Sequence, residues 1–390
     1  MTLGVHKEGI MFVARLKIES HIGGMQRVTE VLAHEFIRYG YTVIYLVEAS
    51  GDNDVVNGVM QFHIPIINSS KRNKVYVQNL IDLHNIKYVV NQCFEYNIFK
   101  FLASFPRIKI ISCWHNCITS HIENFRGIID YGVWPDYLKV ISRNKIVYMA
   151  LYSRFRYRFK NNFITAVRYS DKVILLSENY IPEMKLLVPN CSLNNVMSIS
   201  NPISFEYEKV DYALKENILL YIGRFDDMQK RTDRIIEIWS SLYKQYSEWS
   251  FYIVGSGPSR DSLLSLINKN KLERIYVLPA QDPMPLYRRA KILCMTSAFE
   301  GFPLVLVEAQ MFGVVPFAFN SFAAAREIID NYKTGFLIKP FEIDDYTKTL
   351  ASIMRDDQKY MNMSKLCIKS SYRYSRSVII EKWLKLFASI

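Results

Sequence analysis

The sequence lacks the features of a secreted or membrane-spanning protein. Its six cysteines are scattered without a C-x-x-C pair, which predicts reduced thiols rather than a disulfide framework. The N-terminus carries no long apolar segment of the kind found in secretory signals. No run of about 18 uninterrupted apolar residues occurs; the nearest, residues 304–319, is broken by Glu308, Gln310, Gly313 and Pro316. We therefore expect a cytoplasmic protein, and attachment to the inner face of a membrane stays open as an alternative.

Acidic residues are scarce relative to basic ones, 37 against 49, which gives a formal net charge of +12. This balance favours anionic partners such as nucleotide phosphates, acidic lipid headgroups or nucleic acid. The excess is concentrated between residues 139 and 172, where Asp171 is the only acid. Aromatic residues alternate with the basic ones there: Tyr148, Tyr152, Phe155, Tyr157, Phe159 and Phe163. Two interpretations stay open, a membrane-surface segment or a solvated basic face with a packed aromatic side.

The length and composition predict two α/β domains. The chain has 390 residues, of which half are hydrophobic and 22% charged, so a large core is expected and wholesale disorder is excluded. Short apolar segments alternate with helical patterns, which is typical of parallel sheets. In the first half, a helix is expected to open at Gly23-Gly24, and strands are expected at 10–14, 42–47, 87–91, 109–113 and 172–176.

The alternation pauses at a polar stretch, residues 205–217, and then resumes. Strands are expected at 218–222, 250–254, 275–278, 291–295, 314–318 and 335–338, and helices at 232–243, 259–268 and 303–312. We predict two Rossmann-like doubly wound domains facing across a cleft: residues 1–204, a linker at 205–217, and residues 218–376. Residues 377–390 are expected to form a C-terminal helix that could pack back on the first domain. In such sheets, ligands bind beyond the carboxyl ends of the strands.

The most informative motif contains two carboxylates, Glu300 and Glu308, separated by seven residues. It lies between the strand expected at 291–295 and an apolar helix. Gly301 allows the backbone to approach a ligand closely, and Pro303 suits the first helical position because its missing N–H costs nothing there. The positive end of the helix dipole then offers an anion site at the backbone N–H groups near Phe302 and Leu304.

Two cations follow the strand expected at 218–222. Arg224 and Lys230 could clamp a pyrophosphate, Arg through its forked donors and Lys as a point charge. A solvated basic loop is the alternative. The turn Gly255-Ser-Gly257-Pro258 follows the next strand, and because it lacks the third glycine of a dinucleotide fingerprint, NAD binding is not expected.

Four weaker signals lie in the first half. The Gly23-Gly24 loop could approach a phosphate or sugar, or it is simply a tight turn. His115 follows the strand at 109–113, where a neutral imidazole could bond a sugar hydroxyl, although a lone histidine is more often structural. A zinc site is disfavoured, because the spacing of Cys113, His115, Cys117 and His121 matches no standard module. The D-x-D at residues 52–54 is interpreted as a solvated turn rather than a metal–diphosphate site.

Taken together, these motifs resemble retaining family-four glycosyltransferases of the GT-B fold, of the type that builds polysaccharides and glycolipids. The order and spacing of the Arg224–Lys230 pair, the Gly255–Pro258 turn and the Glu300–Glu308 pair carry the resemblance. Lesser matches are Gly23-Gly24-x-x-Arg27, Ser170-Asp171-Lys172-Val173, Asn201-Pro202 and Gly335-Phe336-Leu337. The resemblance covers nearly the whole chain and is strongest from residue 218 to residue 339.

The resemblance implies a role for each site residue. Arg224 and Lys230 would neutralise the departing diphosphate, Glu300 would bind hydroxyls of the donor sugar, and Glu308 would accept hydrogen bonds from the ribose. His115 would lie near the sugar's C6 hydroxyl or the reacting centre. The backbone of Gly23 and Gly24 and of Gly301, Phe302, Pro303 and Leu304 would complete the donor site. Members of this family work without a metal or other cofactor.

The implied activity is transfer of a hexose or N-acetylhexosamine from a nucleotide sugar, with UDP favoured over GDP. The acceptor would be a saccharide or a lipid-diphosphate-linked saccharide in surface polysaccharide synthesis, such as lipopolysaccharide or capsule. The first domain would bind the acceptor and the second the donor. The chain departs from the family pattern at three points. The interval from Arg224 to Lys230 is one residue longer than the commonest form, Arg231 replaces a usual glycine, and Ala280 stands where a glycine often ends a strand.

Other functions remain as alternatives. A nucleotide-sugar epimerase of the same fold would convert the donor without a separate acceptor. A degenerate protein of the same fold would bind a ligand without catalysing a reaction. Nucleic-acid binding is suggested only by the net charge, and Glu300 argues against it because a carboxylate there would repel phosphate.

Overall fold

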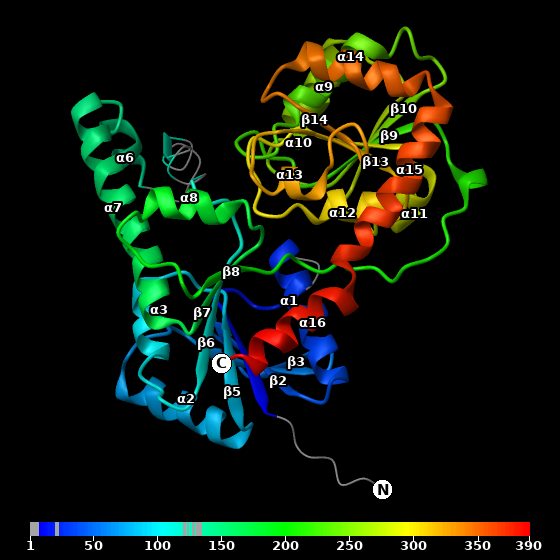
Figure 1. Ribbon diagram of the computed structural model, residues 1–390. Coiled ribbons are helices and arrows are strands. Elements are labelled where there is room, and N and C mark those ends of the chain that lie inside the picture. The colour runs from blue at the N-terminus through cyan, green and yellow to red at the C-terminus, as the bar shows by residue number, and fades with distance from the viewer. Residues whose placement is uncertain (1–7, 20–22, 120–121, 123–124, 127–128, 130–134) are drawn as a thin grey trace, which may run out of the picture. The chain divides into compact units, whose positions relative to one another are not determined.

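The computed structural model describes residues 8–19, 23–119, 122, 125–126, 129 and 135–390, which form two compact units (Figure 1). The first unit comprises the chain up to Ser204 together with Arg376–Ile390, and the second comprises Phe205–Ser375. Residues 205–217 contain one short 3-10 helix, η1 (Tyr212–Leu214), and cluster with the second unit. No described helix combines the length and the apolar character that a membrane crossing requires.

The first unit is built on an eight-stranded sheet. Its order is β3-β4-β2-β1-β5-β6-β7-β8, and every neighbouring pair is parallel except the β3–β4 hairpin. All six residues of β1 are buried, as expected for a central parallel strand that is covered on both faces. The strand bounds are β1 Gly9–Ala14, β2 Thr42–Glu48, β3 Asp54–Val56, β4 Val59–Ile64, β5 Ile86–Asn91, β6 Lys109–Trp114, β7 Lys172–Leu175 and β8 Val196–Ser198.

The helices of the first unit include the C-terminal segment of the chain. Helix α16 packs on α1, because the rings of Trp383 and Phe387 both contact Phe36. Phe387 also stacks on Tyr88 with ring centroids 4.3 Å apart. The bounds are α1 Gly24–Arg38, α2 Lys71–Leu83, α3 Tyr96–Leu102, α6 Asp136–Ile141, α7 Lys145–Tyr169, α8 Tyr180–Leu187 and α16 Arg376–Ala388.

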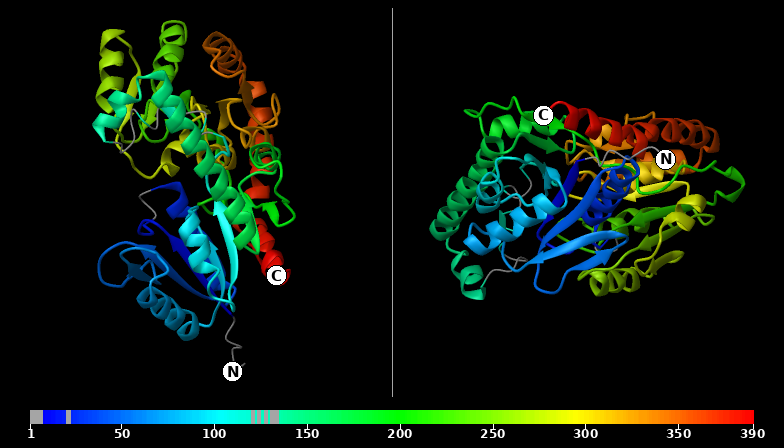
Figure 2. Two further views of the ribbon diagram at one scale, coloured as in Figure 1. Left: turned by 90° about the vertical axis from the view of Figure 1, so that its left-hand side faces the viewer. Right: turned by 90° about the horizontal axis from the view of Figure 1, so that it is seen from below.

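Helix α7 is the longest of the described helices, with 25 residues, and lies beside α3 and β7 (Figure 2). One of its faces is aromatic and packs inside the unit. Phe159 and Phe163 contact the ring of Trp114, while Tyr152 contacts Phe125. Of the aromatic residues between 139 and 172, Phe159 and Phe163 are buried, whereas Tyr148, Tyr152 and Phe155 are half-buried and Tyr157 is 72% exposed. The predicted alternative of a basic face with a packed aromatic side describes this part of α7.

The second unit is a six-stranded, wholly parallel sheet of order β11-β10-β9-β12-β13-β14. Its strands are β9 Ile218–Ile222, β10 Ser250–Val254, β11 Ile275–Leu278, β12 Ile292–Met295, β13 Val315–Phe319 and β14 Phe336–Ile338. Its helices are α9 Asp233–Leu242, α10 Arg260–Lys269, α11 Met284–Arg289, α12 Leu304–Met311, α13 Ala325–Ile328, α14 Ile343–Met354 and α15 Asp357–Ser371, followed by η2 Tyr372–Tyr374. Wholly buried aromatic side chains such as Trp239, Phe251 and Tyr346 fill its core.

The structure differs from the sequence prediction at two local points. Pro303 is the N-cap of α12 rather than its first helical residue, so the helix begins at Leu304. Asp54, interpreted as part of a solvated turn, instead begins β3 and accepts a hydrogen bond from His63 Nε2 at 3.2 Å. The side chain of Gln61 also donates to Asp54, at 3.0 Å. Asp54 thus holds the β3–β4 hairpin together.

Candidate functional site

The centre of the candidate site is an ion pair between Lys230 and Glu300. Lys230 Nζ donates to Glu300 Oε1 at 2.6 Å, and the two side chains are only 20% and 8% exposed. Lys230 follows β9 and Glu300 follows β12, and these strands are paired in the sheet. Because the carboxyl ends of parallel strands meet at one edge, the two loops come together where ligands bind in such folds. The structure thus brings together two residues that the sequence predicted for one site.

The loop that carries Lys230 is organised by Asp226. Asp226 Oδ1 accepts hydrogen bonds from the backbone N–H groups of Met228 and Gln229 at 2.9 and 3.0 Å. Its carbonyl oxygen accepts from the N–H groups of Lys230 and Arg231. Arg231 adopts a positive φ of 50°. A left-handed backbone favours glycine, which explains why a glycine is usual at this place in the family pattern.

Gln229 links the other members of the site and was not predicted from the sequence. Its Nε2 donates to Glu300 Oε2 at 3.3 Å and to the carbonyl oxygen of Phe299 at 3.2 Å. Its Oε1 lies 3.4 Å from Arg224 Nη2. No sequence signal marks Gln229 except that it precedes Lys230, because its role depends on a loop about 70 residues away.

Arg224 lies on the same loop and is more exposed than Lys230. Its side chain is 59% exposed, and Nη2 donates to Asp226 Oδ2 at 2.7 Å. Gln229 lies within hydrogen-bonding distance of both Arg224 and Glu300. The two predicted cations therefore lie on one loop with Gln229. Lys230 is partly buried against Glu300, whereas Arg224 faces solvent.

The glycine turn after β10 supports this loop by close backbone contact. Gly255 and Gly257 have φ angles of +156° and +151°, which L side chains rarely adopt. A Cβ at Gly255 would lie 1.9 Å from the carbonyl oxygen of Gly223, and one at Gly257 would lie 2.3 Å from that of Phe225. The two loops are also joined by the N–H of Phe225, which donates to the carbonyl oxygen of Ser256 at 2.8 Å. Glycine is required here to position the loop that carries Arg224.

Glu308 lies inside α12 and has no exposed surface. Its Oε2 accepts a hydrogen bond from the hydroxyl of Tyr287 at 3.2 Å, and the Tyr287 ring stacks on Phe312. A carboxylate at this depth requires hydrogen bonds, because burying a charge is costly. The N-terminus of α12 follows Gly301, Phe302 and Pro303, so the positive end of the helix dipole faces the loop that begins with Glu300.

The remaining predicted residues, Gly23, Gly24 and His115, belong to the first unit. Gly23 is the N-cap of α1 in an extended conformation that any residue can adopt, and Gly24 is the first residue of the helix. Among the residues that the structure describes, a Cβ at Gly23 would meet the end of the Gln26 side chain, at 3.0 Å.

His115 follows β6 with both imidazole nitrogens buried. Neither nitrogen has a hydrogen-bond partner within the part of the chain that the structure describes. Burial lowers the pKa of His115 to about 4, so the ring is neutral at physiological pH. A buried neutral imidazole with unused polar atoms can accept from or donate to a hydroxyl group.

The alternative of a zinc site includes His121, which lies outside the described residues. Among the described residues, no three His, Cys, Asp or Glu side chains come together in a metal-binding arrangement. Cys113 is buried, and burial raises the pKa of its thiol, which disfavours the thiolate that binds metal.

Comparison with known proteins finds a family whose sequences match part of the chain and solved structures of similar fold. Residues 204–369 match the family described as glycosyl transferases group 1. The amylovoran biosynthesis glycosyltransferase AmsD of Erwinia amylovora is 28% identical over 64% of this chain and 76% of its own. A Campylobacter jejuni N-acetyl-D-galactosaminyltransferase, named for a GalNAc-containing saccharide on diphospho-undecaprenol, is 28% identical over 57% of this chain and 58% of its own. The chain thus spans about three fifths to three quarters of the length of these relatives.

The fold has close counterparts among solved structures. HepE from Anabaena, solved in complex with UDP and glucose, superposes with a TM-score of 0.73. The match covers 98% of this chain and 100% of HepE at 15% sequence identity. This likeness confirms the GT-B fold that the sequence predicts.

Proposed function

We propose that this chain, whose residues 204–369 match the group 1 glycosyl transferases, transfers a sugar from a nucleotide-sugar donor to a saccharide acceptor in cell-surface polysaccharide synthesis. The observation that carries the proposal is the ion pair of the partly buried Lys230 with the buried Glu300 at the carboxyl edge of β9 and β12. The names of the Erwinia and Campylobacter relatives, and the UDP and glucose bound to HepE, support it.

The donor is proposed to be a UDP-hexose or UDP-N-acetylhexosamine, with retention of the anomeric configuration. An ammonium group has three donors, so Lys230 can keep its bond to Glu300 and still donate to a phosphate oxygen. Glu300 would then hold hydroxyls of the sugar while Lys230 holds the diphosphate, which places the bond to be broken between them. Arg224, on the same loop, would add a forked donor to the leaving phosphate.

This arrangement supplies leaving-group stabilisation from the protein itself. Positive groups aimed at developing charge in a shielded site are a large source of rate enhancement. Lys230, Arg224 and the N-terminus of α12 would share this role, so we propose that transfer requires no metal. Glu308 would accept hydrogen bonds from the ribose, and because Glu308 is fully buried, the ribose must displace side chains that cover it.

His115, Gly23 and Gly24 are also proposed to bind the donor. His115 is neutral and has two polar ring atoms, so it suits a hydroxyl of the transferred sugar better than a phosphate. The backbone at the start of α1 would approach the donor phosphates, since a helix N-terminus favours anions.

We also propose that the enzyme contacts an anionic membrane surface through α6 and the start of α7. Large apolar side chains are exposed there, and Lys139, Arg143 and Lys145 lie among them. Exposed apolar groups beside cations favour the interface of anionic bilayers. The apolar side chains are Tyr137, Val140, Ile141, Ile146 and Met149. Sedimentation with phosphatidylglycerol vesicles should show binding that falls at high salt, and absence of binding at low salt would contradict this proposal.

A thermal-shift screen tests the donor site. UDP, GDP, ADP and their common sugar conjugates would be added to the folded protein, first without metal and then with magnesium. A ligand that binds only the folded state raises its melting temperature. We expect a metal-independent shift with the UDP series. Conversion of the bound UDP-sugar to its epimer, without transfer to any acceptor, would favour the epimerase alternative instead.

A further inference from the structure

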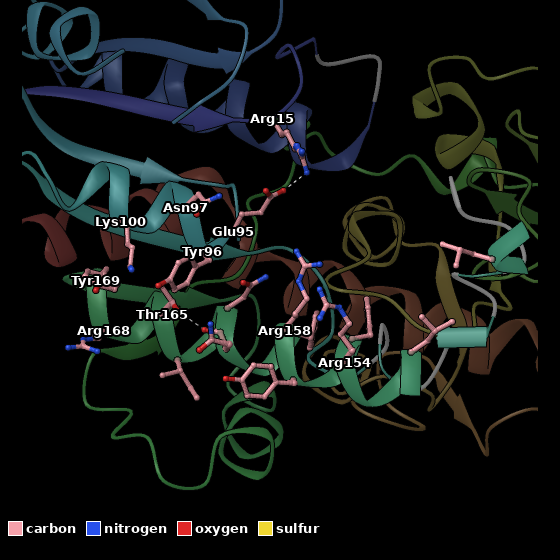
Figure 3. A pocket seen from close by; sticks show the side chains of 18 residues that line it. Arg15, Glu95, Tyr96, Asn97, Lys100, Arg154, Arg158, Thr165, Arg168 and Tyr169 are labelled. Atoms are coloured by element: carbon pink, nitrogen blue, oxygen red, sulfur yellow. Dashed lines mark hydrogen bonds and ion pairs between the residues drawn. The ribbon is translucent and has the colours of Figure 1, made fainter. Parts of the chain in front are cut away.

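The first unit contains a cavity of about 1220 Å³ between α3 and α7 (Figure 3). Arg15 and Glu95 line one end of this α3–α7 pocket. Arg15 directly follows β1, and Glu95 lies in the loop between β5 and α3. The pocket therefore opens at the carboxyl edge of the sheet, where ligands of such folds bind. Its volume exceeds the roughly 300–1,000 Å³ typical of small-molecule sites, so it has room for a large ligand.

Positive charge dominates the lining of the α3–α7 pocket. It contains five cations and one carboxylate, and that carboxylate, Glu95, is already paired with Arg15. Arg154 and Arg158 project from the same side of α7 in Figure 3. Neither has a hydrogen-bond or ion-pair partner in the described portion of the chain. Like charges four residues apart destabilise a helix, so an anion bound between them would relieve a repulsion. The remaining cations are Lys100 and Arg168.

Helix α7 lines the pocket with both aromatic and polar side chains. Phe155 and Phe159, which contact Phe125 and Trp114, reach the pocket beside Arg154 and Arg158. Asn161 and Asn162 continue the polar part of the lining. Arg156 lies between the two arginines in sequence but does not line the pocket. The pocket thus combines cations with aromatic rings, and Arg156 is a natural control for the two arginines.

We propose that the α3–α7 pocket binds a phosphate group of the acceptor, either a diphosphate or a phosphodiester that joins the saccharide to its carrier. Guanidinium groups match phosphate oxygens with forked hydrogen bonds, and two of them in one pocket can hold a diphosphate. Tyr157 lines the same cavity and is 72% exposed, so its ring can offer a face for a sugar. The proposal rests on the proposed function, because it assigns the acceptor side of the same transfer.

The test measures binding of inorganic diphosphate by isothermal titration calorimetry. The 390-residue chain with Lys230→Ala serves as the parent, because this change is expected to weaken diphosphate binding at the proposed donor site. Adding Arg154→Gln and Arg158→Gln should weaken the remaining binding about tenfold or more, as expected for lost charge-assisted hydrogen bonds. Adding Arg156→Gln to the same parent should leave the affinity for diphosphate unchanged. Equal binding by all three proteins would overturn the proposal.

A second measurement separates a phosphate-bearing acceptor from a lipid surface. The same variants would be sedimented with phosphatidylglycerol vesicles. We expect Arg154→Gln with Arg158→Gln to reduce vesicle binding no more than Arg156→Gln does. If the double variant loses vesicle binding but binds inorganic diphosphate as its parent does, the pocket is a lipid-facing surface and the proposal fails. Binding of UDP to the unaltered chain, measured separately, reports on the proposed function alone.

Discussion

Lys230 Nζ donates a hydrogen bond to Glu300 Oε1 at 2.6 Å, and only 8% of the Glu300 side chain is exposed. Exposed ion pairs contribute little to stability, whereas breaking a buried pair leaves a charge that is costly to keep in the interior. The pair joins the loops that follow β9 and β12. It therefore fixes the distance between the group that would hold the diphosphate and the group that would hold the sugar.

Replacing Lys230 by alanine should lower turnover by about two to three orders of magnitude, the range found when other electrostatic stabilisers are removed. The reason is the loss of the cation that stabilises the leaving diphosphate. The measurement is the rate of nucleoside diphosphate release from the donor with acceptor present. Lys269→Ala is the control, because Lys269 is an exposed residue at the end of α10. Its turnover should equal that of the original protein. Near-normal turnover in Lys230→Ala would remove Lys230 from the mechanism.

Glu300→Gln should chiefly slow transfer and leave nucleotide affinity within a few-fold of the original. The amide keeps the shape of the side chain and can still bond Gln229, but it lacks the charge that orients Lys230 and the sugar. The values of kcat and KM should be determined together with the Kd for UDP. A variant that loses UDP binding while its kcat is unchanged would place Glu300 on the nucleotide instead.

Glu308→Ala should weaken nucleotide binding more than it lowers the rate of sugar transfer once the donor is bound. Because Glu308 is fully buried and accepts from Tyr287, alanine should also reduce the free energy of unfolding by about 1–3 kcal/mol. Tyr287→Phe removes the same hydrogen bond but keeps the carboxylate, so it should lower stability with a smaller effect on UDP affinity. Equal UDP affinity in Glu308→Ala and the original protein would exclude the ribose contact.

Gly257→Ala should destabilise the second unit and reduce donor affinity together. Its φ is +151°, and the added Cβ would lie 2.3 Å from the carbonyl oxygen of Phe225, beside Arg224. Gly58→Ala is a matched control, since Gly58 also has a positive φ, +83°, but has nothing within 4 Å of its Cβ position. Urea unfolding and UDP titration of both variants measure the difference. Unchanged UDP affinity in Gly257→Ala would mean that the turn does not position the donor loop.

His115 should make the first unit sensitive to acid. Burial lowers its pKa from 6.5 to about 4, so between these pH values the unfolded chain binds a proton that the folded chain does not. This contribution to stability is complete above about pH 6.5 and is lost as the pH falls toward 4, by roughly 3 kcal/mol at most. The urea midpoint should fall less in His115→Gln than in the original protein on going from pH 7 to pH 5. Equal falls would show that His115 is not held neutral by burial.

The sequence predicts most of the sheet strands because parallel strands are short apolar segments between turns. It predicts Lys230 and Glu300 together because each follows such a strand. It misses the β3–β4 hairpin, whose strands contain polar residues such as Asp54 and Gln61 that bond each other across the hairpin. It also misses Gln229, whose partners are fixed only when two distant loops meet.

The packing of α7 shows a second limit of local sequence patterns. The aromatic residues between 139 and 172 have a composition that suits either a membrane surface or a core. Their partners, among them Trp114 and Phe125, come from other segments of the chain. Only the tertiary arrangement reveals that Phe159 and Phe163 are buried while Arg154 and Arg158 line a cavity.

The most direct test of the central claim is the Kd of UDP measured without metal for the original protein, Lys230→Ala and Lys269→Ala. The account predicts that UDP binds the original protein and Lys269→Ala equally and binds Lys230→Ala about tenfold or more weakly, because a charge-assisted hydrogen bond is lost. Equal binding by all three proteins, or no binding of UDP by folded protein, would contradict a donor site at Lys230 and Glu300.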